Sequence, residues 1–249
     1  MKITTASRVS KWALAVAAAS VLGGCATTGG DPRDPAEGFN RAMFGFNEGL
    51  DNVVLKPVAT GYDAVLPDPV QTGVSNFFSN IADLMIGVNN LLQGKPGDAA
   101  SDVGRVLVNT TVGFLGILDV ASSMGMEKHD EDAGQTLGSW GAPDGAYVVL
   151  PFFGPRTARD TVGLVFDWYT DPVTYIRHVP TRNALVATRV VSNRAEMLKA
   201  SSIIEEAALD KYSYVRDAYL QRRRSLIYDG NPPKKLDADA DAPAPGAGN

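Results

Sequence analysis

Cysteine and histidine are scarce in this chain, and their scarcity limits its chemistry. One cysteine and two histidines occur among 249 residues. A single thiol cannot form a disulfide within the chain, and His129 and His178 do not stand in a metal-ligand spacing. The sequence contains neither a G-x-S-x-G nucleophile elbow nor a glycine-rich phosphate loop ending in lysine. We therefore predict a protein that is not an enzyme, with no catalytic residues, no metal site and no cofactor.

Long apolar runs are also missing. Residues 12–22 form an apolar stretch that is too short to span a bilayer, which needs about 20 residues. Lys2, Arg8 and Lys11 precede it and small residues follow it, which is the layout of a secretory signal. We expect residues 1–24 to be a signal peptide and expect no transmembrane helix.

The stretch ends in Leu22-Gly23-Gly24-Cys25, and this lipobox contains the only cysteine. It resembles a bacterial lipoprotein signal, in which the cysteine is lipidated and becomes the first mature residue. Two acyl chains give stable membrane attachment where one does not. Ala26 is not the aspartate that retains such lipoproteins in the inner membrane, so the resemblance implies a lipid-anchored protein of the outer membrane, on the periplasmic side. Residues 25–33 would be the lipidated tether.

Positive charge is in short supply as well. The signal holds three of the 23 basic residues and none of the 28 acidic ones, which leaves 20 against 28, a net charge of −8. This balance argues against nucleic acid and against attraction to anionic headgroups. Residues 231–249 are rich in proline, alanine and aspartate, and we expect a disordered tail there. Residues 34–230 remain as one all-α domain.

Helix signals mark most of this domain. Asp34-Pro35 and Glu37 predict a helix start, and the apolar spacing predicts a helix that ends near Pro57. Asp68-Pro69 predicts a second helix, whose apolar stripe runs to Gly94. Its opposite face carries amides and hydroxyls instead of Lys and Glu. This face could be the back of a core helix, or it could lie among headgroups, line a wet passage or pack on polar partners.

Later segments give weaker signals. We expect helices at 98–118, from Pro155 with its apolar side inward, at 182–199 and at 202–228. Residues 134–154 predict an ordered, hairpin-like segment that either crosses the core or dips into lipid. The charged run 128–132 predicts a solvated loop, and Arg222, Arg223 and Arg224 a solvated helix end in preference to a phosphate site.

Together, these segments resemble the MlaA (VacJ) family of outer-membrane lipoproteins. The matching blocks are DPAEGFNRAMFGFNEGLD (34–51), KPVATGY (56–62), NNLLQGK (89–95), GRVLVNTTVGFLGILDVAS (104–122), GQTLGSWG (134–141), YVVLPFFGPRTARD (147–160) and VRDAYLQRR (215–223). Three positions depart from the family pattern: Ala133 replaces the usual Phe, and Arg156 and Ala158 replace the usual Ser and Leu.

The resemblance implies an all-α, ring-like bundle of amphipathic helices embedded in the inner leaflet of the outer membrane, with a central amphipathic passage. Such proteins remove mislocalised phospholipids from the outer leaflet and pass them to a soluble periplasmic carrier, and they bind trimeric porins. This non-enzymatic transport would maintain lipid asymmetry. By motif match, the candidates for the lipid passage are Phe44, Phe46, Asn47, Tyr147, Phe152 and Phe153. The alternative is a porin-associated structural lipoprotein that carries no lipid.

Overall fold

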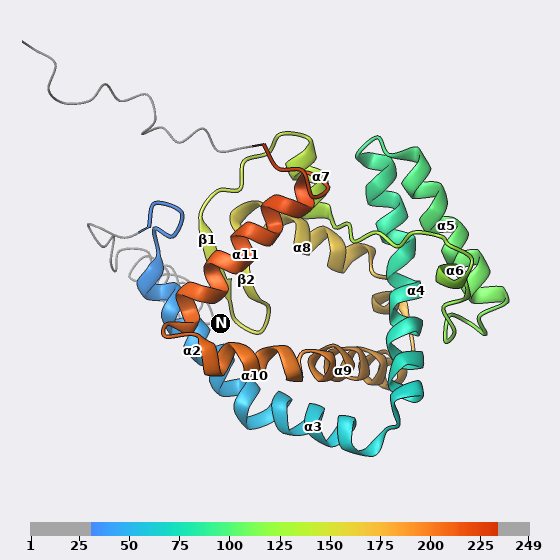
Figure 1. Cartoon of the computed structure of the whole chain (residues 1–249), viewed down its shortest axis with the longest axis horizontal. Helices are drawn as coiled ribbons and strands as arrows, with labels where there is room; N and C mark the ends of the chain where they lie inside the picture. Colours follow the sequence, from blue (N-terminus) through green and yellow to red (C-terminus); the bar gives the residue numbers. More distant parts are fainter. Residues whose placement is uncertain (1–30, 234–249) are drawn as a thin grey trace, which may run out of the picture.

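The computed structural model describes residues 31–233, so Cys25, the expected signal and residues 234–249 of the expected tail lie outside the described residues. Helices dominate the described chain (Figure 1). The elements are α2 (Glu37–Leu50), a π-helical turn (Asp51–Leu55), α3 (Lys56–Val65), α4 (Asp68–Leu92), α5 (Pro96–Thr111), α6 (Val120–Ser123), α7 (Ala133–Ser139), β1 (Tyr147–Leu150), β2 (Gly154–Thr157), α8 (Ala158–Thr170), a 3-10 turn (Pro172–Tyr175), α9 (Val179–Glu196), α10 (Leu198–Ala207) and α11 (Lys211–Ile227).

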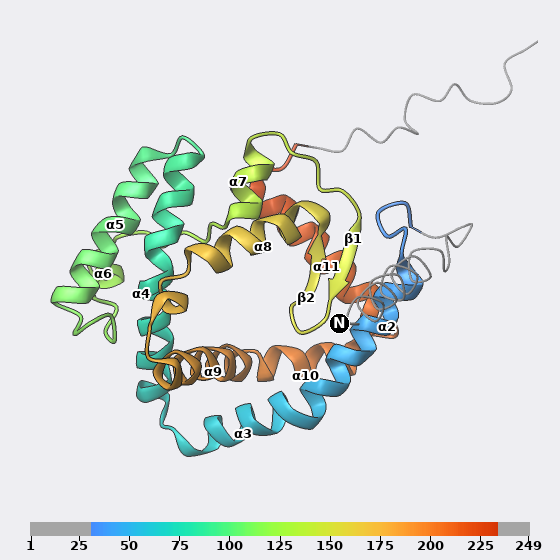
Figure 2. The same ribbon diagram turned by 180° about the vertical axis from the view of Figure 1, so that it is seen from behind.

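The long helix α4 organises one half of the molecule, as Figures 1 and 2 show from opposite sides. α5 packs along the outer side of α4, and this pair forms the most extensive contact between two helices. α9 contacts both α3 and α4, and α10 follows it toward α2. The other half is built from α2, α7, α8 and α11, with the two strands among them.

The described chain is mostly helical, as expected, and its two strands form one small hairpin. β1 and β2 pair antiparallel, with Tyr147 opposite Thr157 and Leu150 opposite Gly154. A Tyr-Val-Val-Leu run between glycine and proline residues favours extended structure over helix. The hairpin-like segment expected at 134–154 is therefore confirmed for its second half, while its first half contains the short helix α7.

The first helix does not end at Pro57 as the sequence suggested. Proline has no N–H to donate to the carbonyl four residues earlier. The π turn shifts the pairing by one residue just before the proline, so that Lys56 N–H donates to Asp51 O. α3 then continues to Val65.

Other helix boundaries also differ from the prediction. The helix expected from Pro155 begins only at Ala158, because Pro155 lies in β2. α5 stops at Thr111 because Phe114, Leu115 and Gly116 follow in the left-handed region, at φ of 56°, 60° and 86°. The helix expected at 202–228 is two helices, and Asp210 caps the second by accepting the N–H groups of Tyr212 and Ser213. By contrast, α4 begins at Asp68 and ends just before Gly94, as predicted.

Candidate functional site

Polar side chains fill the interior of the described chain, and apolar side chains cover much of its outside. The buried set contains 17 polar or charged residues and ten apolar ones. Exposed large apolar residues on α4, α5 and the turn after α5 include Val88, Leu91, Leu92, Val103, Leu107, Val112, Phe114, Leu115 and Leu118. Large exposed apolar patches of this kind are uncommon on the surfaces of soluble domains and mark interaction surfaces.

The interface between α4 and α5 shows how the polar interior is satisfied. Asp83 and Arg105 are both buried and form an ion pair across it, with Nε and Oδ2 3.3 Å apart. Lys128, from the segment after α6, binds the other oxygen of Asp83. Buried charges of this kind need partners in direct contact. The part of the amide-rich face of α4 from Asp83 to Asn90 accordingly packs on polar partners, which was one of the four alternatives. The first turns of that face, from Gln71 to Asn76, instead line an open pocket.

A second buried chain of polar contacts lies at the other end of this interface. Asn90 donates its amide N–H to Asp102 Oδ2 at 2.8 Å, and His129 Nδ1 lies 2.9 Å from Asp102 Oδ1. His129 and Lys128 belong to the charged run 128–132, which is a loop as predicted but is only partly solvated. Lys128 and Asp130 are exposed, whereas His129 is partly buried because it pairs with the buried carboxylate of Asp102.

The hairpin is held to α2 by two asparagines that are seven residues apart, on one face of the helix. Asn40 is fully buried, donates to Tyr147 O at 3.0 Å and accepts from Val149 N–H at 2.8 Å. Asn47 donates to Leu150 O at 2.9 Å and accepts from the N–H of Phe152 at 2.8 Å. Each side-chain amide thus donates to one backbone carbonyl of the hairpin and accepts from one backbone N–H, as a neighbouring strand would. Asn40 was missed in the sequence, although its two-turn spacing from Asn47 was visible.

The six candidate passage residues occupy three different environments. Phe44 and Tyr147 belong to the apolar core with Tyr212, and Tyr147 is only 1% exposed. Asn47 forms, together with Asn40, the pair of asparagines that holds the hairpin to α2; we call this pair the asparagine clamp. Phe46, Phe152 and Phe153 are exposed at and beside the hairpin tip.

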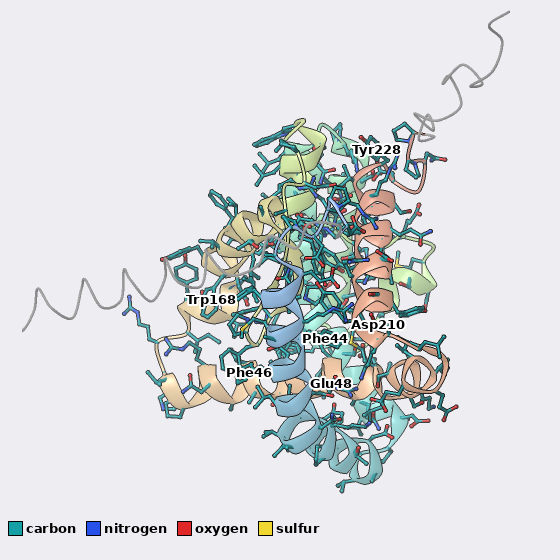
Figure 3. All side chains as sticks on the ribbon, turned by 90° about the vertical axis from the view of Figure 1, so that its left-hand side faces the viewer. Phe44, Phe46, Glu48, Trp168, Asp210 and Tyr228 are labelled. Atoms are coloured by element: carbon teal, nitrogen blue, oxygen red, sulfur yellow. The ribbon has the colours of Figure 1, made fainter. Side chains whose placement is uncertain are left out.

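Aromatic contacts join the hairpin tip to the helices on its two sides. Phe46 of α2 meets Phe152 edge to face, with ring centroids 5.6 Å apart, and Phe153 lies 5.9 Å from Trp168 of α8. Phe152 is 72% exposed, and its backbone φ of 68° is rare for residues other than glycine. Figure 3 shows Phe44 between α2 and α11, with Phe46 and Trp168 on the other side of α2. The tip therefore presents an aromatic surface held by the clamp.

A charged cluster fixes α7, α8 and α11 to one another. Arg223 binds Asp132 and Asp160, and Tyr219 donates its hydroxyl to Asp160 at 2.6 Å. Burial pushes the pKa of Asp160 upward, but the Tyr219 hydrogen bond and the Arg223 charge outweigh burial and lower that pKa to about 2. Arg223 is thus neither part of a solvated helix end nor free to bind phosphate, and no local sequence pattern indicates its buried partners.

Asp167, two turns along α8 from Asp160, has the opposite shift. Burial raises its pKa to about 6, and the one hydrogen bond it accepts, from Ala133 N–H, lowers the pKa by less. Val165 and Phe166, beside it, are exposed, so the expectation that the apolar side of this helix faces inward is wrong. The inward side of α8 is the polar one because it meets α7 and α11 through charges.

Within residues 31–233, no group of three His, Cys, Asp or Glu side chains could hold a metal ion, and no helix is long and apolar enough to cross a membrane. An open groove of about 1030 Å³ lies between α11, the segment 138–145 and residues 32–33. None of the six candidate residues lines it.

Comparisons with known proteins agree with the resemblance seen in the sequence. A family model described as MlaA lipoprotein matches residues 32–226. The Escherichia coli protein named intermembrane phospholipid transport system lipoprotein MlaA is 33% identical over 85% of this chain and 86% of its own length. The Haemophilus influenzae protein of the same name is 30% identical over 87% and 90%. An uncharacterized protein of Rickettsia typhi is 33% identical over 78% of both chains.

A solved structure matches the described fold. It comes from work described as the structural basis for maintenance of bacterial outer membrane lipid asymmetry. The match has a TM-score of 0.68 at 33% identity and covers 80% of this chain and 99% of the other.

Proposed function

This chain belongs to the MlaA lipoprotein family, and we propose that it moves phospholipids from the outer leaflet of the outer membrane to a soluble periplasmic carrier. The transport would involve no covalent chemistry and would maintain the lipid asymmetry of the membrane. The names of the relatives support phospholipid transport. The direction, the carrier and the membrane are our proposal.

The inverted polarity of the fold is the observation that carries this proposal. A phospholipid has a charged headgroup and two apolar tails, and moving the headgroup through hydrocarbon alone is costly. A protein that keeps polar groups inside and apolar groups outside can lie in hydrocarbon and still offer the headgroup a polar route. We propose that the helices form a ring in the inner leaflet and that this route is a central passage.

The hairpin tip is the proposed point of lipid contact. Phe46, Phe152 and Phe153 expose their rings there and would meet acyl chains. Phe44, Tyr147 and Asn47 would hold that tip in place from the core and the clamp. A fixed tip keeps the aromatic surface in one geometry, which lowers the entropic cost of ordering it when lipid binds.

The anchor and the partners complete the proposal. Lipidation of Cys25 would attach the chain to the periplasmic side of the outer membrane, since two acyl chains suffice for stable attachment. A trimeric porin would hold the protein at the place where lipids are removed.

The test measures phospholipid exposed on the cell surface in a strain without this protein. An amine-reactive reagent that does not cross the membrane labels exposed phosphatidylethanolamine. We expect labelling to rise on deletion, to fall when the intact chain is restored, and to stay high with Cys25→Ala. Unchanged labelling together with loss of porin would contradict transport and favour a porin-associated structural role.

A second measurement separates lipid carriage from a structural role. A photo-crosslinking amino acid replaces Phe152 at the hairpin tip or Tyr214 on α11, both of which are exposed. α11 is rich in charged side chains, so Tyr214 provides the matched control. We expect phospholipid adducts at position 152 and few at 214. Equal adduct yields at both positions would contradict a lipid path at the hairpin tip.

A further inference from the structure

Arg156 lies on β2, in a strand position that alternates with the buried Thr157. It is paired in register with Val148, whereas the neighbouring pair, Tyr147 and Thr157, is almost fully buried. Successive residues of a strand face opposite sides, so Arg156 and Val148 share the face opposite to that core. Arg156 comes three residues after Phe153 and therefore lies about 10 Å from the tip along the strand.

Arg156 has no hydrogen bond or ion pair to any residue within 31–233, although most of the other arginines there are paired. Its Nε atom is buried and has no partner in that part of the chain. An unpaired buried donor on a charged group is unfavourable. The guanidinium therefore has its binding capacity free for a ligand.

The surroundings of Arg156 fit an amphipathic ligand. Toward the tip lie the exposed rings of Phe152 and Phe153, which offer contact to hydrocarbon. Asp167 is near enough for its charge to be influenced by Arg156, yet the two form no ion pair. A free guanidinium about 10 Å from an apolar surface suits a molecule that has an anionic group and a long hydrocarbon part.

We propose that Arg156 binds the phosphate group of a phospholipid while the aromatic tip of the hairpin contacts its acyl chains. This inference rests on the proposed transport function and adds to it a residue that distinguishes phospholipids from lipids without phosphate. Guanidinium and phosphate match each other in geometry and can share two parallel hydrogen bonds. Because every phospholipid carries the phosphate, Arg156 selects the class and leaves the headgroup type open.

The experiment compares two lipids that have the same acyl chains. The full lipidated chain, purified in neutral detergent, is incubated with dioleoylphosphatidylethanolamine or with dioleoylglycerol, and retained lipid is quantified by mass spectrometry. We expect Arg156→Gln to lower phospholipid retention about tenfold and to leave dioleoylglycerol retention unchanged. Arg156→Lys, which keeps the charge, retains most of the phospholipid binding.

A control variant removes charge elsewhere. Arg177 is exposed and has no ion pair among the described residues, so Arg177→Gln is expected to bind both lipids as the parent does. Unfolding temperatures of all variants are measured alongside. Because Arg156 makes no hydrogen bond or ion pair within residues 31–233 and its buried Nε is unpaired, Arg156→Gln is expected not to lower the unfolding temperature.

Three outcomes would overturn the assignment of Arg156. Arg156→Gln could retain phospholipid as the parent does, or lose both lipids equally, which would make the residue a support for the hairpin. Millimolar inorganic phosphate could displace the lipid, which would point to a site for free phosphate. If the parent retains neither lipid, the proposed function fails together with this inference, whereas the first three outcomes leave that function standing.

Discussion

The two carboxylates on the inward side of α8 give opposite predictions for one and the same substitution. Asp167 has a pKa raised to about 6 from 3.8, and Asp160 has one lowered to about 2. Replacing each with Asn removes the charge and keeps an oxygen that can accept the same hydrogen bonds. We expect Asp167→Asn to stabilise the protein at neutral pH and Asp160→Asn to destabilise it.

The magnitudes follow from the shifts. A rise of about two pKa units corresponds to at most about 3 kcal/mol, and screening at a partly exposed site reduces this to about 1–2 kcal/mol. Above pH 6 the folded protein must bury the Asp167 charge, so the full advantage of Asn appears there. Between pH 6 and 4 the folded carboxyl takes up a proton, and the advantage disappears.

Asp160 behaves in the opposite way because its pKa is depressed. Its stabilising effect is present above about pH 4 and is lost as the pH falls toward 2. At pH 7, Asp160→Asn leaves Arg223 short of a buried partner, and we expect a loss of about 2–4 kcal/mol.

Urea unfolding of the full chain in neutral detergent at pH 4.5, 6 and 7.5 measures both effects. The difference in the free energy of unfolding between Asp167→Asn and the parent should grow with pH. A constant difference across this range, or a loss of stability at pH 7.5, would refute the electrostatic reasoning. Asp160→Asn serves as the control, since a general effect of Asn on α8 would give both variants the same sign.

Further predictions concern the backbone and the clamp. Gly116→Ala should destabilise the fold by more than about 1 kcal/mol, because φ is 86° and an added Cβ would lie 2.7 Å from the side chain of Asn80. Gly125→Ala provides the control, since its φ is 79° and no atom lies within 4 Å of the added Cβ. Equal unfolding free energies for the two variants would contradict the steric argument. Asn40→Ala leaves a buried N–H and a carbonyl of β1 unpaired and should cost about 1–3 kcal/mol in urea unfolding, so an unchanged midpoint would show that Asn40 is not needed to hold the hairpin.

Local signals in the sequence predicted helices well and their environments poorly. The proline and aspartate at 68–69 and the glycine at 94 bound α4 as expected, since start and stop chemistry depends on adjacent residues. The same periodicity was wrong about Val165 and Phe166, because it locates an apolar stripe without saying whether protein or another medium covers it. The interruption between α10 and α11 was hidden for a similar reason: Asp210 caps a helix only because the chain turns there.

The hairpin-like segment was predictable because glycine and proline residues mark it along the chain. Phe152 and Phe153 were named only through the family resemblance, and their exposure at the tip was not predicted. The roles of Phe44 and Tyr147 depend on Tyr212, which lies far away in the sequence, so no local pattern separates them from Phe46. The partners of Lys128 and Arg223 are likewise distant carboxylates, and a run of charges alone reads as solvated surface.

The asparagine clamp on β1 also bears on aggregation. A free two-stranded hairpin is marginally stable in water, and its open edge invites pairing with another chain. Here Asn40 and Asn47 bind the outward N–H and carbonyl groups of β1 and the tip, so that another chain finds these groups already occupied. The two amides therefore protect β1 against edge-to-edge pairing with a second chain.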